Sequence, residues 1–395
     1  MNAFEELLSL SVEEKKTRGL EFTPTEIAQQ PSVWRKTVAL LIEQREALLE
    51  FMRRTGMTGK REAVIVLSGA GSSEFIGNAV ANALRVGLRR EVLAVPTTHM
   101  VTHGQDVFVP GHRYVLVSFA RSGNSPESLA AWRVARKTVP DIPQMVITCN
   151  SEGALAREAG DDGNAICFVL PEETNDRGLA MTSSFSSMAL TALALPLLKA
   201  PQKLKALVES LSRGAERVIS KGAETLSDFA EKPFTRACFL GSNTLYGTMQ
   251  ECHLKMQEMT EGRVACCFES FLGLRHGPQV FVNNECVVVA ALSTDPFVRL
   301  YEVDMLRELK RKQQSCGVLA ICDRETTEIS DTCTHVVELY PNGKPVADTY
   351  RVVTDVAVGQ MLALFKSLKM GLKPDNPSES GTINRVVQGV TIYER

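Results

Sequence analysis

The sequence lacks the features of nucleic-acid-binding and membrane proteins. Its 44 Lys and Arg residues are balanced by 46 Asp and Glu residues, and no run of basic residues offers a surface to a nucleic acid. The N-terminus, MNAFEELLSLSVEEKK, has neither the basic start nor the apolar core of a signal peptide. The most apolar segment, MALTALALPLL, is too short to cross a bilayer. We therefore expect a cytoplasmic protein with no nucleic-acid or membrane partner.

The ten cysteines lack the spacing of a metal site. No CxxC occurs, and the Cys252-His253 and Cys266-Cys267 pairs match no zinc-binding pattern. Most of the cysteines lie in apolar runs such as ITCN, AICF and LAICD, where a free thiol behaves as a small buried apolar side chain. The sequence therefore predicts structural thiols and no metal.

The sequence does contain a pattern of short apolar runs alternating with helical segments, and this pattern occurs twice. The apolar run around Leu67 recurs around Leu240, and the runs around Val117 and Cys149 recur at the same separation of 173 positions. Short strands that alternate with helices indicate a parallel sheet with helices on both faces. We therefore predict an α/β protein with two copies of one domain.

The predicted parts of the chain are a helical segment at 1–55, a first domain at 56–200, a second domain at 201–370 and a C-terminal tail at 371–395. In the helical segment, Thr23-Pro24-Thr25-Glu26 matches a capping box with proline at the first helical position. The following long amphipathic stretch, WRKTVALLIEQREALLEFM, follows helical period.

Three loops of the first domain are rich in small hydroxyl residues. They contain GAGSS at 69–73, ARSGNS at 120–125 and TSS at 182–184, and each precedes a helical segment. Backbone N–H groups at a helix N-terminus, together with hydroxyl donors, suit a phosphate, although serine also caps helices for structural reasons. Neither a P-loop nor a dinucleotide-binding spacing is present. Three such loops favour a phosphomonoester over a nucleotide.

The second domain carries charged residues on a predicted helix. Glu251, Lys255 and Glu258 fall within roughly 60° of each other on a helical wheel. One interpretation is a solvated face with ion pairs, and the other is a functional cluster. His276 follows in the loop LRHGP, where it is not expected to be a core residue.

These segments resemble the sugar isomerase (SIS) superfamily of phosphosugar enzymes. The longer segments SGNSPES, DRGLAMTSS and SGTINRVVQGV resemble most specifically the bacterial galactosamine-6-phosphate deaminase/isomerases, which contain two SIS domains in tandem. The resemblance extends from about Thr25 to Thr391. It implies two tandem SIS domains, each a parallel sheet flanked by helices, after an N-terminal helical extension.

The resemblance also implies a phosphate-binding set for an open-chain hexose 6-phosphate. That set comprises Ser72, Ser73, Arg121, Ser122, Ser125, Thr182, Ser183 and Ser184. Many family members have serine where this chain has Ala120, so one hydroxyl contact is missing, and Arg121 is able to replace it with a charge-assisted hydrogen bond.

The catalytic roles likewise come from the resemblance. Glu258 matches the general base that moves a proton between C2 and C1, and Lys255 either positions Glu251 and Glu258 or polarises a substrate oxygen. His276 matches the residue that opens the sugar ring, and in relatives a neighbouring subunit can supply it. The resemblance therefore implies a homodimer or homotetramer.

The C-terminal tail departs from one branch of the superfamily. Gln388 lies about where glucosamine-6-phosphate synthase has its Schiff-base lysine, and Asn384 belongs to the same expected lid. Residue 2 is Asn2, so the N-terminal cysteine nucleophile of a glutaminase is also missing. Both departures favour ammonia release or plain isomerisation over synthesis.

The sequence thus predicts an enzyme that converts D-galactosamine 6-phosphate to D-tagatose 6-phosphate and ammonia, without metal or organic cofactor. Two alternatives remain open. One is an aldose–ketose isomerase that acts on tagatose 6-phosphate without deamination. The other is a non-catalytic phosphosugar sensor, which is disfavoured because Glu258 and His276 are retained.

Overall fold

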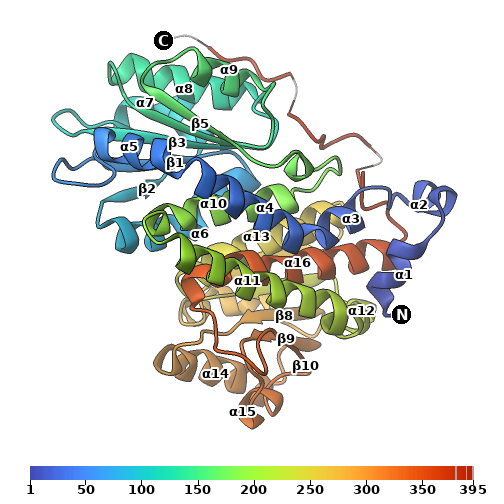
Figure 1. Cartoon of the computed structure of the whole chain (residues 1–395). Coiled ribbons are helices and arrows are strands. Elements are labelled where there is room, and N and C mark those ends of the chain that lie inside the picture. The colour runs from blue at the N-terminus through green and yellow to red at the C-terminus, as the bar shows by residue number, and fades with distance from the viewer. Residues whose placement is uncertain (379, 388, 394–395) are drawn as a thin grey trace. The chain divides into compact units, whose positions relative to one another are not determined.

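The computed structural model describes residues 1–378, 380–387 and 389–393, and these form two compact units. Each unit is built on one parallel five-stranded sheet (Figure 1). The first-sheet unit comprises Ser32–Asp176, Ser183–Val208 and Ile383–Arg395. The second-sheet unit comprises Met1–Pro31, Arg177–Thr182 and Glu209–Thr382. The predicted α/β class with two parallel sheets and an N-terminal helical segment is confirmed.

The first sheet has the strand order β2-β1-β3-β4-β5. Its strands are β1 (Val64–Ser68), β2 (Val92–Ala94), β3 (Tyr114–Ala120), β4 (Gln144–Thr148) and β5 (Ala165–Val169). Every residue of β3 and β4 is buried, because helices cover both faces of the sheet. This burial explains why these strands read as continuous apolar runs rather than as an alternating pattern.

Alternate residues of the strands face different helices. Val66 and Leu116 pack with α7 (Thr97–Val107) and α8 (Pro126–Thr138), and α9 (Ala154–Gly160) lies on the same side (Figure 1). Leu67 points to the other side, toward α6 (Ser72–Leu88), which packs with α10 (Ser183–Ala194).

The second sheet repeats this plan with the order β10-β9-β8-β6-β7. Its strands are β6 (Arg236–Leu240), β7 (Ala265–Glu269), β8 (Cys286–Ala291), β9 (Gly317–Cys322) and β10 (His335–Glu338). In the first sheet Leu67 lies opposite Val117, and in the second Leu240 lies opposite Ala290. The 173-residue repeat therefore corresponds to the same strand register in both sheets.

Helices also cover both faces of the second sheet. One face packs against α14 (Pro296–Arg311) and α15 (Thr327–Ser330). On the other side, α13 (Thr244–Met259) packs along α16 (Asp348–Lys369), which also contacts α12 (Ala223–Glu231) (Figure 1). Among the described residues, no helix is both long and apolar enough to cross a bilayer.

The remaining α-helices of the described residues are α1 (Ala3–Ser9), α2 (Val12–Arg18), α3 (Thr23–Ala28), α4 (Gln30–Glu43), α5 (Arg45–Thr55) and α11 (Pro201–Arg217). The capping box predicted at Thr23 is wrong. Thr23 is the first residue of α3, and its hydroxyl donates to Asp375 at 2.7 Å, while Glu26 accepts hydrogen bonds from the backbone of Arg177 and Gly178. Capping boxes are instead present at the starts of α1 and α2.

The long stretch of helical period predicted after Pro31 is helical but is divided by a break. The chain forms two helices, because α4 ends at Glu43 and α5 begins at Arg45, with Gln44 between them.

Candidate active site

The loop after β1 places two hydroxyls at the start of α6. Ser72 and Ser73 are the first residues of that helix and both are buried. The turn is very tight, because a Cβ atom added to Gly69 would lie 2.4 Å from the carbonyl carbon of Ser73. Gly71 has a φ of 57°, a left-handed conformation that glycine adopts without strain. The two glycines therefore bring the chain directly from the strand end into the helix.

The loop after β3 forms a second turn at the same edge of the sheet. Ser68 and Ser118 are register partners in the parallel strands β1 and β3, so the loops that follow these strands are neighbours. Ser125 caps α8, because its Oγ accepts from the backbone N–H of Ser128 at 3.2 Å. Ser122 is half-buried. The edge thus combines hydroxyls with two helix N-termini, which together favour an anion.

A guanidinium group lies beside these hydroxyls. The Arg121 side chain is buried, and its Nη2 donates to the carbonyl oxygen of Arg385 at 2.5 Å. Arg385 in turn donates to the carbonyl oxygen of Asp176 and to Asn175 Oδ1, both at 2.7 Å. The C-terminal segment around Arg385 is therefore anchored next to the loop that follows β3. Ala120 is buried at the end of that strand.

The third hydroxyl-rich segment is engaged within the chain. Ser183 and Ser184 are fully buried, and their hydroxyls donate to the two carboxylate oxygens of Asp176 at 2.5 Å. The backbone N–H of Ser184 also donates to Asp176, at 2.8 Å. Thr182 is buried as well, and its carbonyl oxygen accepts from Gln360. The carboxylate of Asp176 therefore occupies the N-terminus of α10, where an external anion would otherwise bind.

The charged cluster on α13 lies inside the second-sheet unit. The side chains of Glu251 and Lys255 have no exposed surface, whereas Glu258 keeps 24% of its side-chain surface exposed. Lys255 Nζ lies 3.3 Å from Glu251 Oε1 and 2.5 Å from Glu258 Oε2. The interpretation of this helix face as a solvated face is therefore wrong. A buried lysine between two acids requires a specific packing environment.

Lys255 and Glu258 differ in charge and in exposure. Burial acts to lower the pKa of Lys255, but the carboxylates of Glu251 and Glu258 outweigh it and raise the pKa above its ordinary value. Lys255 therefore stays cationic at neutral pH. Glu258, the exposed member, is the carboxylate that a ligand can reach.

His276 lies on an exposed turn that is anchored from one side. It ends the short 3₁₀ segment Gly273–His276, and Gly277 follows with a φ of 126°. The neighbouring Arg275 binds Asp304 at 2.8 Å and Glu308 at 2.9 Å on α14. The turn is thus fixed to α14 while the imidazole faces outward.

The two predicted residues of the C-terminal lid cannot be treated alike. Asn384 is exposed in the described segment. Gln388 lies outside the described residues.

One residue near the cluster was not predicted. His253, also on α13, lies with its ring centre 4.9 Å from that of Phe268, and its Nδ1 is 2.6 Å from the carbonyl oxygen of Gln250. Burial is the main cause that lowers the pKa of His253. The sequence did not indicate His253, because it does not share the helix face on which the spacing places Glu251, Lys255 and Glu258.

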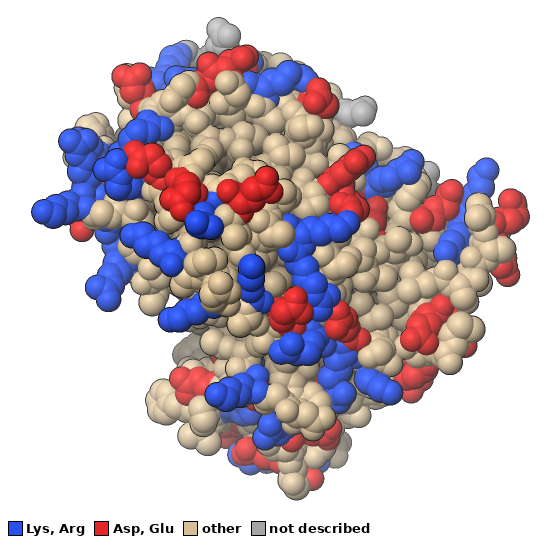
Figure 2. Space-filling view, viewed as in Figure 1, with Lys and Arg blue, Asp and Glu red and all other residues tan. Residues whose placement is uncertain are grey.

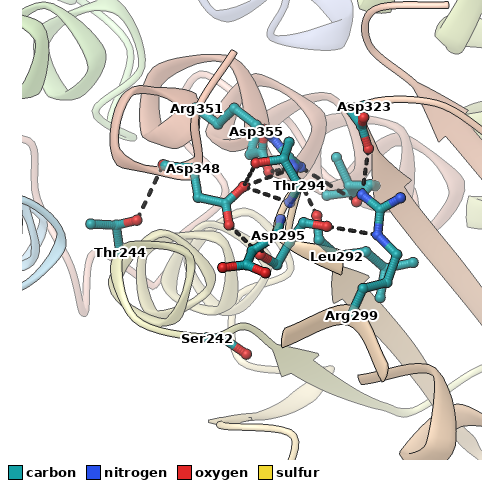
Figure 3. A network of polar contacts seen from close by, with 12 residues as sticks. Ser242, Thr244, Leu292, Thr294, Asp295, Arg299, Asp323, Asp348, Arg351 and Asp355 are labelled. Atoms are coloured by element: carbon teal, nitrogen blue, oxygen red, sulfur yellow. Dashed lines mark hydrogen bonds and ion pairs between the residues drawn. The ribbon is translucent and has the colours of Figure 1, made fainter. Parts of the chain in front are cut away.

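A second unpredicted feature is an internal carboxylate at the loop after β8, the counterpart of the loop after β3 (Figure 3). Asp348 accepts from the hydroxyl of Ser293 and from both the backbone N–H and the hydroxyl of Thr294, the last two at 2.8 Å. Arg351 lies 3.4 Å from the same carboxylate and forms a buried pair with Asp355 at 2.7 Å. The serine and threonine donors of this loop are thus bound by the chain itself.

Among the residues that the structure describes, no group of three or more His, Cys, Asp or Glu side chains is arranged to hold a metal ion.

Comparison with known proteins identifies relatives over nearly the whole chain. Residues 60–197 match the SIS domain. The chain is 38% identical to D-galactosamine-6-phosphate deaminase AgaS of Escherichia coli over 94% of this chain and 95% of that protein. It is 35% identical to the protein of the same name from Shewanella sp. (strain ANA-3) over 98% of this chain and 95% of that protein.

Solved structures agree with these relatives. The chain matches a protein from Clostridium novyi NT, provisionally assigned as a tagatose-6-phosphate ketose/aldose isomerase, with a TM-score of 0.94 and 36% identity over 98% of this chain and 99% of that chain. It matches the tagatose-6-phosphate ketose/aldose isomerase of Escherichia coli with a TM-score of 0.85 and 35% identity over 94% of this chain and 96% of that chain. The chain therefore belongs to the AgaS family of SIS-domain proteins.

Proposed function

We propose that this protein is a deaminase/isomerase that converts D-galactosamine 6-phosphate to D-tagatose 6-phosphate and ammonia. The substrate follows from the AgaS relatives, which are named D-galactosamine-6-phosphate deaminases and are 38% identical to this chain. The observation that supports the chemistry is the partly exposed carboxylate of Glu258, which the buried Lys255 holds at 2.5 Å. A positioned carboxylate next to a fixed cation suits proton transfer at carbon.

The phosphate group is proposed to bind at the carboxyl edge of the first sheet. Ser72, Ser73, Ser122 and Ser125 supply hydroxyl and helix N-terminal donors there, and Arg121 supplies a positive charge. We assign Thr182, Ser183 and Ser184 a supporting role, because Asp176 already occupies the hydroxyl donors of the two serines.

The proposed reaction begins with ring opening by His276, which exposes the C1 aldehyde. Glu258 then removes the proton from C2, the electron pair forms the C1–C2 double bond of an enolamine, and the former carbonyl oxygen on C1 takes up a proton from water. Return of that proton from Glu258 to C1, with loss of one N–H proton to water, leaves an imine between C2 and the substrate's own nitrogen. Water adds to C2 and ammonia leaves, which gives the ketose. Atoms and charges balance without a cofactor, so the proposal includes none.

The decisive variant is Glu258→Gln. It removes the base but keeps the size of the side chain, so turnover should fall about 10²–10⁴-fold. Binding of galactosamine 6-phosphate, followed as the rise in melting temperature, should persist. The matched control is Glu261→Gln, which removes a carboxylate that pairs with Arg263 just beyond the end of α13. Turnover by Glu258→Gln at the rate of the control would show that Glu258 is not the base.

A second candidate activity is aldose–ketose isomerisation without deamination, favoured by the names of the two similar solved structures. The two activities are separated by following ammonia and ketose phosphate together during incubation with galactosamine 6-phosphate. Equal release of both supports the deaminase. Ketose formation from an aldose phosphate, with no ammonia from the amino sugar, supports the isomerase. A rise in melting temperature without either product would favour the sensor alternative.

We further propose that the active protein is a cytoplasmic homodimer or homotetramer in which His276 is shared between subunits. The outward-facing imidazole on an anchored turn supports this arrangement. Mixing inactive Glu258→Gln and His276→Ala chains tests it, because shared sites would recover activity in the mixed oligomer. The boundaries 1–55, 56–200, 201–370 and 371–395, with the last segment as a lid, remain predictions.

A further inference from the structure

A cavity of about 460 Å³ lies in the first-sheet unit, away from the hydroxyl-rich loops. Its walls include Val64 at the start of β1, the last turn of α6, and the residues that precede β2 and β3. The cavity is thus at the amino ends of the strands. The hydroxyl-rich loops follow the carboxyl ends of the same strands, so the two locations are at opposite edges of one sheet.

Four arginines line this cavity: Arg85, Arg89, Arg90 and Arg113. Glu62, Glu91 and His112 also line it, so the charged side chains carry an excess of two positive charges even with a neutral imidazole. This excess is notable in a chain whose net charge is −2. Lys and Arg side chains gather in this region, at the left of the molecule near β1 and β2 (Figure 2).

Arg90 has a structural role in the cavity. Only 8% of its side chain is exposed, and its Nε and Nη2 donate to the carbonyl oxygens of Gly56 and Gly59 at 2.9 and 2.5 Å. Its Nη1 lies 3.7 Å from Glu62. Arg90 therefore fixes the loop that forms one wall, and it also neutralises one of the two acids.

The other three arginines make no ion pair with any residue that the structure describes. They differ in this respect from Arg133 and Arg136 of the same unit, which bind Glu158 and Asp162 at 2.7 Å. Arg85, Arg89 and Arg113 come from α6, from the α6–β2 connection and from the residue before β3. Three separate segments thus bring unpaired guanidinium groups to one cavity.

The backbone at Arg89 supplies an independent observation. Arg89 directly follows the last residue of α6 and has a φ of 53° and a ψ of 51°, the left-handed conformation that glycine commonly adopts after a helix. A non-glycine residue there costs free energy, and such costs are concentrated at functional positions. Arg89 therefore occupies a backbone conformation that glycine would adopt with less strain.

We propose that this cavity binds a small molecule that carries two or more phosphate groups. Guanidinium groups bind phosphate oxygens in a bidentate manner, and three of them exceed what one phosphomonoester needs. The volume of the cavity suits a metabolite rather than a macromolecule. Two carbonyl oxygens near the end of α6, which would repel an anion, are already bound: that of Arg85 by the backbone N–H groups of Arg89 and Arg90, and that of Arg89 by Nη1 of Arg90.

The test uses isothermal titration calorimetry with inorganic pyrophosphate at about 150 mM ionic strength, where exposed charges are screened. The full chain carries Ser122→Ala and Ser125→Ala, which weaken the proposed substrate-phosphate loop. Into this background we would place either Arg85→Ser with Arg113→Ser, or the control pair Lys203→Ser with Lys205→Ser. The control removes the same charge from exposed positions of α11 in the same unit.

The proposal predicts one pyrophosphate per chain in the background and in the control, with at least tenfold weaker binding after the two arginine substitutions. Inorganic phosphate should bind this site more weakly than pyrophosphate. Equal affinity of the arginine variant and the control, or binding that disappears at this ionic strength, would overturn the proposal. A second pyrophosphate that remains bound in every variant would show that Ser122→Ala and Ser125→Ala do not weaken the other phosphate site. That result would count against the proposed substrate-phosphate loop and not against the arginine-lined cavity, so failure of one proposal is distinguishable from failure of the other.

Discussion

The buried charges of α13 lead to a quantitative prediction about stability. In Lys255→Met, the counter-ion disappears from between Glu251, which is fully buried, and Glu258. Leaving a buried charge without its partner costs about 3–5 kcal/mol. The two contacts, at 3.3 and 2.5 Å, are both lost, so we expect the upper half of this range. Equilibrium urea denaturation followed by circular dichroism measures the difference in the free energy of unfolding.

A double variant separates the missing charge from the missing methylene contacts. In Lys255→Met with Glu251→Gln, the fully buried acid is also neutral, so about 2 kcal/mol or more of the loss should be recovered. The single variant should also become relatively less stable as pH rises from 5 to 8, because an unpaired buried carboxyl group prefers its protonated form. The double variant should show this trend more weakly.

The reasoning fails if Lys255→Met costs less than about 1 kcal/mol, the range of an exposed ion pair. It also fails if the effects of the two substitutions simply add, because additivity would mean that Lys255 and Glu251 do not interact.

Two further predictions concern Gly69, in the loop after β1, and His253 on α13. Gly69→Ala places a Cβ atom 2.4 Å from the carbonyl carbon of Ser73, so the backbone must move; we expect a loss of about 1–3 kcal/mol in urea denaturation and weaker binding of the sugar phosphate. Burial lowers the pKa of His253, so its contribution to stability is present above about pH 6.5 and is lost as pH falls through the lower folded pKa. His253→Gln should therefore lose less stability than the wild type between pH 7 and pH 5.

Each of these variants has its own control. Gly160→Ala introduces the same methyl group where no heavy atom lies within 4 Å, and its stability should stay within about 1 kcal/mol of the wild type. An equal loss in both glycine variants would contradict the steric argument. For the histidine, parallel pH profiles of the wild type and His253→Gln would show that its ionisation does not contribute.

The central strands of both sheets could be predicted from the sequence, because buried parallel strands consist of consecutive apolar residues. The repeat detected at Leu67 and Leu240 corresponds to equal register in the two sheets. By contrast, α7 was not predicted, since it contains few apolar residues and is kinked at His103. Its existence follows instead from topology, because β2 and β3 both run parallel to β1 and a crossover must connect them.

Edge strands were the other omission. The strands β7 and β10 lie at the two edges of the second sheet, where residues are only partly buried and the apolar pattern is weaker. Helix breaks are equally hard to predict, because the pattern from Trp34 to Met52 continues through the break at Gln44.

The candidate site shows the same division. The sequence pattern predicted that Glu251, Lys255 and Glu258 share one helix face, and they do. Their burial could not be predicted, because it depends on α16, which lies about 100 residues later in the chain and packs along α13. The hydrogen bond from Ser183 to Asp176 was missed for a different reason, because it joins two residues seven positions apart across an irregular loop, where no helix or strand period applies.

The carboxylate of Asp348 has a consequence for how the two duplicated halves have diverged. Duplication of one ancestral domain would produce two equivalent anion cradles, and in the second the chain supplies its own permanent negative charge to Ser293 and Thr294. A tethered group has an effective concentration that a dissolved ligand cannot match. The hydroxyls of the loop after β8 are therefore not available to an external phosphate. Under the proposed function, saturation should require one equivalent of sugar phosphate per chain rather than two.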